Sequence, residues 1–296
     1  MLKKKEKKGI LFAFLSAFLY DLNVPVSKYC LKALSTNEIL FLLYFGSAIG
    51  LFLLMLFNKK QKFSLKPKKK ELIYIFGVII CDVLASLFII ESLKSVDASI
   101  VSLISILEIS FTIMISYFIF KTKISKNLII AVILVSIGGV LLSFDSSVEF
   151  KLSLASLLTV YATACWGLEN NLTAKVSDKN PLLLVFYKCL AVAIFNLLFI
   201  LKYNIFILLL NNWYLLILGF FSYGLSILYY AYAVNLIGIS KTSIIFSFSP
   251  IFSAITSIVL FNEKINAYFI ISLIFMLLGI YFTIIDKNKK RKGRYL

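Results

Sequence analysis

Long apolar runs separated by short polar breaks dominate the chain. Ten of them have about the length, roughly 20 residues, that a helix needs to cross the hydrocarbon core of a bilayer. They are too continuous for the alternating pattern of membrane β-strands, so we expect helices. The runs lie at 9–33, 37–57, 71–93, 97–120, 126–144, 152–174, 181–201, 213–234, 240–261 and 266–286. The pattern therefore predicts an all-α integral membrane protein with ten transmembrane helices.

Composition agrees with this pattern and narrows the chemistry. The chain is 61% hydrophobic, against about 45 to 50% in soluble domains. The cysteines lie in predicted spans without CxxC spacing, which favours a packing role over a disulfide or a metal site. They are Cys30, Cys81, Cys165 and Cys189. Histidine is absent, so proton transfer has to use carboxylates or lysine, and we expect neither a metal nor another cofactor.

The net charge of +17 would suggest a nucleic-acid partner in a soluble protein, but its distribution indicates a membrane. With both termini placed in the cytoplasm, 24 of the 31 Lys and Arg residues fall on cytoplasmic segments and five on outer loops. This is the positive-inside rule. We therefore expect a multi-pass protein of the cell (plasma or inner) membrane, with both termini cytoplasmic and the basic tail on anionic lipid. No nucleic-acid partner is expected.

The two halves of the chain resemble each other. A shift of 141 residues superposes FKTKIS (120–125) on FNEKIN (261–266), and a downstream glycine keeps the same offset. We expect one repeat at 1–145 and a second, with the basic tail, at 146–296. Five helices per repeat is an odd number, so the second copy is inverted. Inverted repeats are typical of secondary transporters, whose substrate site lies near the midplane between the copies.

Four acidic residues lie deep inside predicted helices. They are Asp21, Asp82, Glu108 and Glu169. At 1.5 Å per residue their short side chains cannot reach either interface, so each must face the bundle interior, a wet cavity or a partner group. A protonated carboxyl bonded between helices is the alternative for any one of them. Asp82 and Glu108 are the candidates for proton coupling.

The sixth predicted helix carries a polar stripe. Trp166, Glu169, Asn170 and Thr173 lie three and four residues apart and so share one face. This face directs an indole, an acid, an amide and a hydroxyl into one space, as a substrate site requires, although Trp166 alone also fits a packing role. Asn171 points to the side and is expected to hold a neighbouring helix.

The first predicted helix has a similar cluster in AFLYDLNVPVSK (17–28). Pro25 removes a backbone donor and frees a carbonyl near position 21. We expect Asp21, Asn23 and Lys28 to line the cavity. For Lys28 two interpretations remain, an intramembrane ion pair with Asp21 and a side chain that extends towards the outer surface.

The seventh and ninth predicted helices add one charge and one break. Lys188 lies seven residues inside the seventh helix from the cytoplasmic side. It either lines the cavity or extends its side chain towards the membrane surface. A cation in the cavity would suit a substrate carboxylate or phosphate. Pro250 interrupts the ninth helix near its middle, and we expect it to act as a hinge together with Pro25.

Several function classes lack their signatures. The chain has no G-x-x-x-x-G-K-[ST] loop for nucleotide hydrolysis, no TVGYG filter and no H-E-x-x-H zinc motif. A transporter that hydrolyses no nucleotide is favoured over an enzyme or a channel. An uncoupled facilitator, an intramembrane enzyme and a non-transporting receptor or scaffold remain as alternatives.

Specific motifs resemble the EamA-type branch of the drug/metabolite transporter superfamily. They are WGLENNLTAK followed by DKNP (166–175, 178–181), ESLKSVDAS (91–99), SILEIS (105–110) and SPIF with FNEKI (249–252, 261–265). The resemblance covers nearly the whole chain and implies ten helices in two inverted copies. It also implies a non-enzymatic secondary carrier, often an exporter, whose substrate is a small metabolite such as an amino acid.

The chain also departs from the family pattern. Thr122 stands where many members have an acid after the fourth helix, although Glu263 is present at the matching place after the ninth. Glu108 and Ile109 occupy the part of the fourth helix where many members have a proline. These differences concern the substrate and the coupling ion more than the fold.

Overall fold

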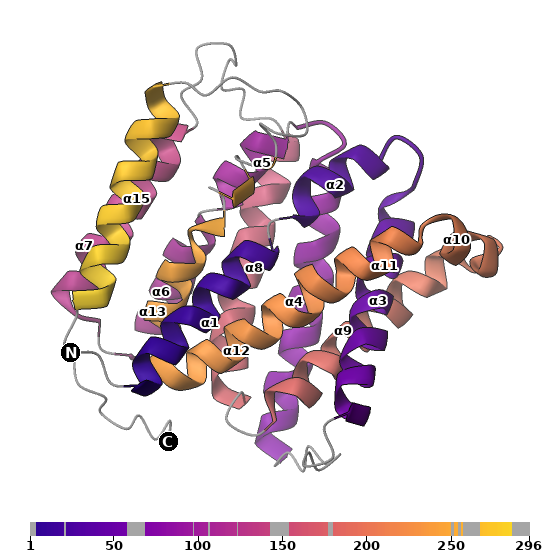
Figure 1. Cartoon of the computed structure of the whole chain (residues 1–296), viewed down its shortest axis with the longest axis horizontal. Helices are drawn as coiled ribbons and strands as arrows, with labels where there is room; N and C mark the ends of the chain where they lie inside the picture. Colours follow the sequence, from indigo (N-terminus) through magenta and orange to yellow (C-terminus); the bar gives the residue numbers. More distant parts are fainter. Residues whose placement is uncertain are drawn as a thin grey trace.

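The computed structural model describes residues 4–20, 22–57, 69–96, 98–105, 107–122, 124–142, 154–176, 180–249, 252–253, 256 and 267–285. Regular structure within these ranges is helical (Figure 1), which confirms the predicted all-α class. The elements are α1 Lys4–Tyr20, α2 Asn23–Cys30, α3 Thr36–Phe57, α4 Lys69–Ser92, α5 Ala98–Ser105, α6 Leu107–Phe118, α7 Lys126–Leu142, α8 Leu154–Val176, α9 Pro181–Ile200, α10 Ile205–Asn211, α11 Trp213–Gly219, the π-helix η1 Phe220–Leu225, α12 Ser226–Ile237, α13 Ile239–Phe246 and α15 Ala267–Ile285.

Five stretches are long and apolar enough to cross a membrane. They are Lys4–Cys30, Thr36–Phe57, Glu71–Ser92, Pro181–Ile200 and Trp213–Ile237. Helix α8 has sufficient length but lower hydropathy, because it carries the Glu-Asn-Asn sequence. The remaining predicted runs also contain helices, and the total of ten crossings stays a prediction.

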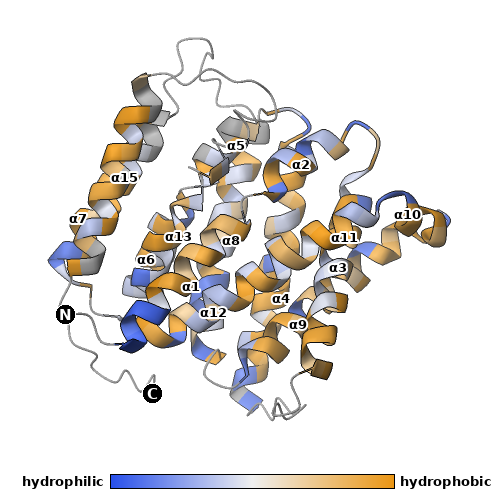
Figure 2. Ribbon diagram, viewed as in Figure 1, coloured by the Kyte–Doolittle hydropathy of each residue, from blue (hydrophilic) through white to orange (hydrophobic). Residues whose placement is uncertain are grey.

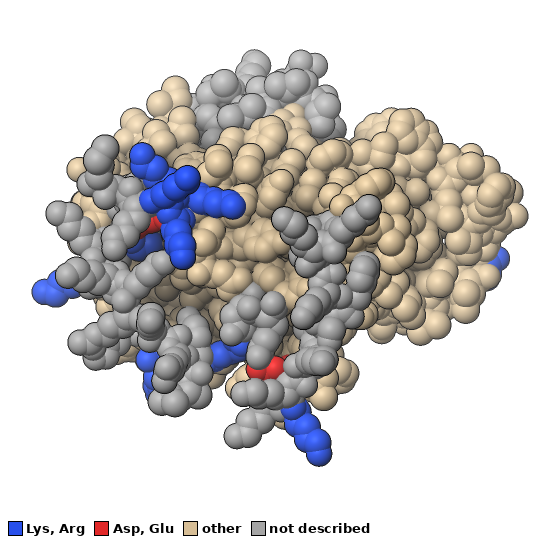
Figure 3. All heavy atoms as spheres, turned by 60° about the horizontal axis from the view of Figure 1, so that its bottom comes forward, with Lys and Arg blue, Asp and Glu red and all other residues tan. Residues whose placement is uncertain are grey.

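The surface suits a lipid environment. Large apolar side chains are exposed along the helices, for example Ile73 on α4, Leu198 on α9 and Ile274 on α15, and Figure 2 shows apolar residues along most of the helices. Basic side chains gather at the end of the bundle where α1 begins (Figure 3). This end includes the exposed lysines Lys4, Lys5, Lys7 and Lys8.

The helices of the two halves pack in a reciprocal pattern. Helix α4 packs on α8 and α1 on α12, while α6 packs on α8 and α1 on α13. Two further pairs join corresponding helices of the halves, α3 with α9 and α7 with α15. In Figure 1 the α7 and α15 pair forms one edge of the bundle, and α3 and α9 lie towards the other. The helices with the polar clusters lie between these pairs.

The shift of 141 residues found between the sequence motifs also relates residues at the centre of the bundle. The same shift superposes Asp82 on Tyr223.

Helices α3 and α11 approach each other closely at two glycines. A Cβ at Gly46 would meet the backbone of Leu216, and one at Gly219 would meet the backbone of Leu43. Ser47 Oγ donates a hydrogen bond to the carbonyl oxygen of Gly219 at 2.7 Å. The absence of a side chain at the two glycines permits this approach, as is common at helix interfaces in membranes.

Regular α-helix is interrupted in three spans near the centre of the bundle. The first span has a turn at Leu22, directly before α2. The π-helix η1 separates α11 from α12, and a turn at Ser247 and Phe248 follows the end of α13. Irregular backbone at membrane depth is tolerated where it lines a cavity or is buried in protein. All three interruptions adjoin the cavity described below.

Candidate functional site

The break in the first span places an aromatic and an amide side chain at the cavity. Helix α1 ends at Tyr20 and α2 begins at Asn23, two residues before Pro25. Asn23 Nδ2 donates to the Tyr20 carbonyl oxygen at 2.7 Å, and Tyr223 OH donates to Asn23 Oδ1 at 3.3 Å. The side-chain amide thus provides a hydrogen-bond donor for a carbonyl at the end of α1. Asp21 lies outside the described residues.

The polar stripe of α8 faces the cavity as a unit. Trp166, Glu169, Asn170 and Thr173 all line the same pocket, as their helical spacing predicts. Asn171 instead donates from Nδ2 to the carbonyl oxygens of Thr112 and Gly167, both at 2.9 Å. Its position on the side of α8 therefore ties this helix to α6.

A buried ionic triad joins three helices at the centre of the site. Lys188 Nζ on α9 lies 3.2 Å from Glu169 Oε1 on α8 and 3.2 Å from Asp82 Oδ2 on α4. The lysine donates a hydrogen bond to Glu169, whereas Asp82 Oδ2 has no hydrogen-bond partner among the described residues. A lysine away from water requires such counter-charges, so the pairing places Lys188 in the protein interior.

Two aromatic residues fix the other oxygen of Asp82. Tyr44 OH donates to Asp82 Oδ1 at 3.0 Å, and Trp166 Nε1 donates to the same atom at 3.3 Å. Tyr44 also packs against Tyr223, with ring centroids 4.6 Å apart. The carboxylate of Asp82 is therefore held from both sides.

Glu108 on α6 is bonded to an amide instead of a cation. Asn170 Nδ2 donates to Glu108 Oε1 at 2.6 Å and lies 3.3 Å from Thr112 Oγ1. The two proton-coupling candidates thus differ, because Asp82 belongs to the ionic triad and Glu108 is separate from it.

The cavity has two compartments that share a wall. We name the first the ionic compartment, with about 450 Å³ of empty space including its open part. It is lined by the triad together with Ser16, Tyr20, Glu108, Trp166, Asn170, Thr173, Tyr223, Ser226, Ile227, Tyr230 and Phe246.

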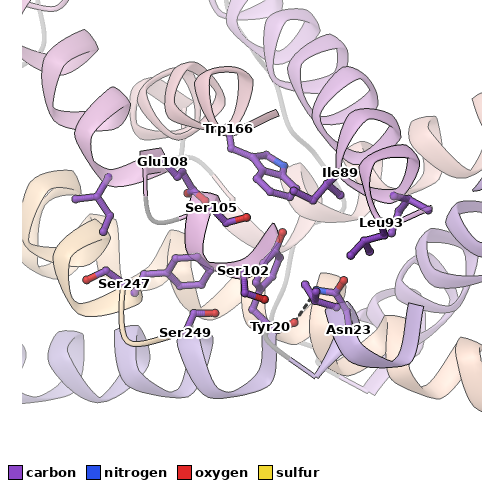
Figure 4. A pocket seen from close by; sticks show the side chains of 14 residues that line it. Tyr20, Asn23, Ile89, Leu93, Ser102, Ser105, Glu108, Trp166, Ser247 and Ser249 are labelled. Carbon is purple, nitrogen blue, oxygen red and sulfur yellow. Dashed lines mark hydrogen bonds between the residues drawn. The ribbon is translucent and has the colours of Figure 1, made fainter. Parts of the chain in front are cut away.

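We name the second the serine compartment, with about 580 Å³ of empty space including its open part. It is lined by four serines, Asn23, Ile109 and a set of apolar side chains (Figure 4). The serines are Ser102, Ser105, Ser247 and Ser249, and the apolar residues are Val24, Ile89, Ile90 and Leu93. Tyr20, Glu108, Trp166 and Phe246 line both compartments.

Lys28 lines neither compartment. Its Nζ donates to the carbonyl oxygens of Leu93 and, at 2.9 Å, Val96. These carbonyls follow the end of α4, where a cation is favourable for the helix dipole. The two lysines left ambiguous by the sequence therefore differ in place: Lys188 lies in the cavity and Lys28 binds backbone at one end of the bundle.

Sequence reasoning missed Tyr44, which donates to Asp82 Oδ1, and the lining residue Tyr223. Tyr44 has no distinguishing signal within its apolar run, but Tyr223 does, because the repeat offset superposes it on Asp82. Pro250, predicted as a hinge, lies outside the described residues, and its neighbour Ser249 lines the serine compartment.

Comparisons with known proteins identify the family. The model of the EamA-like transporter family matches residues 7–144 and 153–285. An uncharacterized transporter of Methanothermobacter thermautotrophicus is 25% identical over 232 residues, which cover 76% of this chain and 68% of the relative. A solved structure titled only as a crystal structure of a protein superposes with a TM-score of 0.77 at 12% identity, over 94% of this chain and 98% of that one. This last likeness concerns the fold alone.

The family match covers most of the chain in two copies, and the apolar helices agree with it. The chain belongs to the EamA-like transporter family of the drug/metabolite transporter superfamily and is a multi-pass membrane transporter.

Proposed function

We propose that the chain is a secondary transporter that exports small metabolites, either amino acids or related amines, by alternating access. The observation that supports this most is the triad of Asp82, Glu169 and Lys188, which lies buried beside a cavity between the two halves. Charges at membrane depth are costly and usually serve the transported species. We assign substrate contact to the lining residues of α8, to Asn23 and to Lys188.

Proton coupling is the second part of the proposal. Asp82 and Glu108 both line the ionic compartment, and the chain contains no histidine. Protonation of either carboxylate would change the charge balance around Lys188 and so favour one orientation of the carrier. In an uncoupled facilitator the same carboxylates would only bind substrate, and saturable flux would not respond to a pH gradient.

The proposal includes the arrangement in the membrane. Ten helices in two inverted copies, with both termini in the cytoplasm of a cell membrane, would place the basic end of the bundle (Figure 3) on the cytoplasmic face. The interrupted spans adjoin the cavity, and Pro25 directly follows the lining residue Val24. A change between inward-open and outward-open forms would bend the spans there. No covalent chemistry is proposed for the carboxylates.

Metabolite profiling of the growth medium tests transport and site together. Cells that express the wild-type chain are compared with cells that express Glu169→Gln at equal membrane abundance. We expect a small set of metabolites to be released by the wild type alone. If neither export nor uptake differs between the two, the assignment of Glu169 to the site is wrong.

A further inference from the structure

Acidic side chains outnumber basic ones in the described lining of the ionic compartment. The lining includes Asp82, Glu108 and Glu169 but one basic residue, Lys188. Lys188 Nζ already lies 3.2 Å from an oxygen of both Asp82 and Glu169. With all four groups charged, the described lining has an excess of two negative charges. Such a compartment attracts a cation and disfavours an anion.

Glu108 is the carboxylate available for that cation. Its Oε1 accepts from Asn170 at 2.6 Å, and within the described part of the chain no lysine forms an ion pair with it. It lines both compartments, and Figure 4 shows its side chain near that of Ser105. A cation at the junction of the compartments would therefore meet an uncompensated acid.

Aromatic rings surround the same junction. The centroid of Tyr20 lies 5.3 Å from that of Phe246 and 6.0 Å from that of Trp166, and Phe246 lies 5.3 Å from Tyr230. All four residues line the ionic compartment. Ring faces attract organic cations and are the usual walls of ammonium sites.

One buried hydroxyl in this compartment has no partner. Thr173 is 5% exposed, and its Oγ1 has no hydrogen-bond partner among the described residues, although it lines the ionic compartment. A buried polar atom without a hydrogen bond destabilises the folded protein. An N–H donor on a bound ligand would satisfy it.

Resting on the transport function proposed above, we propose that the cavity binds an organic ammonium ion without a carboxylate. The ammonium group lies in the ionic compartment between Glu108, Thr173 and the aromatic rings. The neutral body of the amine extends into the serine compartment, where hydroxyls and aliphatic side chains meet it.

Two other ligand classes fit the cavity less well. A zwitterionic amino acid would bring a carboxylate close to Glu108, while Lys188 is already shared by two acids. In this inference Lys188 serves the two acids, in place of the substrate carboxylate or phosphate that the sequence led us to expect. A bare metal cation prefers a shell of several oxygen atoms, whereas rings and aliphatic groups form much of these walls.

A charge series of similar probes tests the inference on the purified full-length protein. Tyramine is cationic, tyrosine adds a carboxylate to it, and 4-hydroxyphenylacetate carries the carboxylate without the amine. Binding is measured as protection against thermal unfolding in detergent, at fixed pH and in titration series. We expect tyramine to bind at least about 10-fold more tightly than tyrosine, a difference of about 1.4 kcal/mol, and 4-hydroxyphenylacetate not to bind.

Two variants and a control locate the ammonium group. Glu108→Gln and Thr173→Val should each weaken tyramine binding, the first by at least about 10-fold. Glu91→Gln changes an exposed acid that pairs with Lys94 and should leave binding as in the wild type. Equal or tighter binding of tyrosine, or tyramine binding unchanged by Glu108→Gln, would overturn the inference. If sodium chloride itself protects the protein against thermal unfolding and also displaces tyramine, the site binds an inorganic cation instead.

Flux into proteoliposomes separates this inference from the proposed function. If tyramine binds through Glu108 but does not cross, the ammonium site stands and transport of this class fails. If tyrosine crosses in a Glu169-dependent way and tyramine neither binds nor crosses, transport stands and the ammonium inference is wrong.

Discussion

The ionic and serine compartments adjoin each other but stabilise their buried polar groups in different ways. The ionic compartment contains charged groups that pair across α4, α8 and α9. The serine compartment contains hydroxyls, and some of these bond within their own surroundings, as Ser102 Oγ does with Ser253 Oγ at 3.1 Å. A buried charge depends on its partner, whereas a buried hydroxyl depends little on any one neighbour. Substitutions in the ionic compartment should therefore have much the larger effects.

Of the substitutions in the two compartments, Lys188→Met should have the largest effect on stability. It leaves Asp82 and Glu169 buried without their shared cation, and we expect a loss of about 3–5 kcal/mol in stability. Thermal unfolding in detergent measures it. Lys202→Met, at an exposed position, serves as the control and should change the midpoint little. Equal midpoints for the two variants would contradict the burial of Lys188 beside its acids.

Glu169→Gln should separate function from folding within the same compartment. The amide keeps the size of the side chain but removes its charge, so we expect flux to fall by about 10- to 100-fold, with only modest loss of stability. Flux per folded molecule is measured in proteoliposomes. The matched control is Glu91→Gln at an exposed position, and a comparable decrease there would argue against a specific role for Glu169.

Tyr44→Phe should have a smaller effect that reports on Asp82. It removes the hydroxyl that donates to Asp82 Oδ1 at 3.0 Å and retains the ring that packs against Tyr223. Hydrogen bonds to charged groups contribute about 1.5–3 kcal/mol. Because Trp166 Nε1 also donates to this oxygen, we expect a loss of stability at the lower end of that range. Equilibrium or thermal unfolding measures it. An additive result in the double variant with Lys188→Met would show that the two contacts are independent.

Ser249→Ala should have the smallest effect, because it lies in the serine compartment and removes no charge. Ser249 lines the serine compartment, and removal of one hydroxyl there should change stability by less than about 1 kcal/mol. Substrate affinity, measured by the KM of flux, should change less than about threefold. A loss as large as that of Glu169→Gln would mean that the serine compartment contributes to recognition as strongly as the charges.

The fold class and one face of the site follow from periodicity. Apolar runs of sufficient length predict the helices, and spacings of three and four residues place Trp166, Glu169, Asn170 and Thr173 on one side of α8. These are local properties of a helix, so one sequence suffices to derive them.

The partners across helices do not follow in this way. Lys188 meets Asp82 through packing of α9 against α4, and no pattern along either helix encodes that distance. Tyr44 is one more aromatic residue in an apolar run. Lys28 has a side chain long enough for several environments, and only its neighbours decide that it binds the carbonyls after α4.

The triad also bears on how the chain enters the membrane during synthesis. A lysine at the centre of a helix raises the free energy of insertion by about 2.5–3.5 kcal/mol. Asp82 and Glu169 both precede Lys188 in the chain, so the ribosome has made both acids before α9 emerges. A partner is thus present for the lysine at the time of its insertion, and translation order itself favours integration of this charged helix.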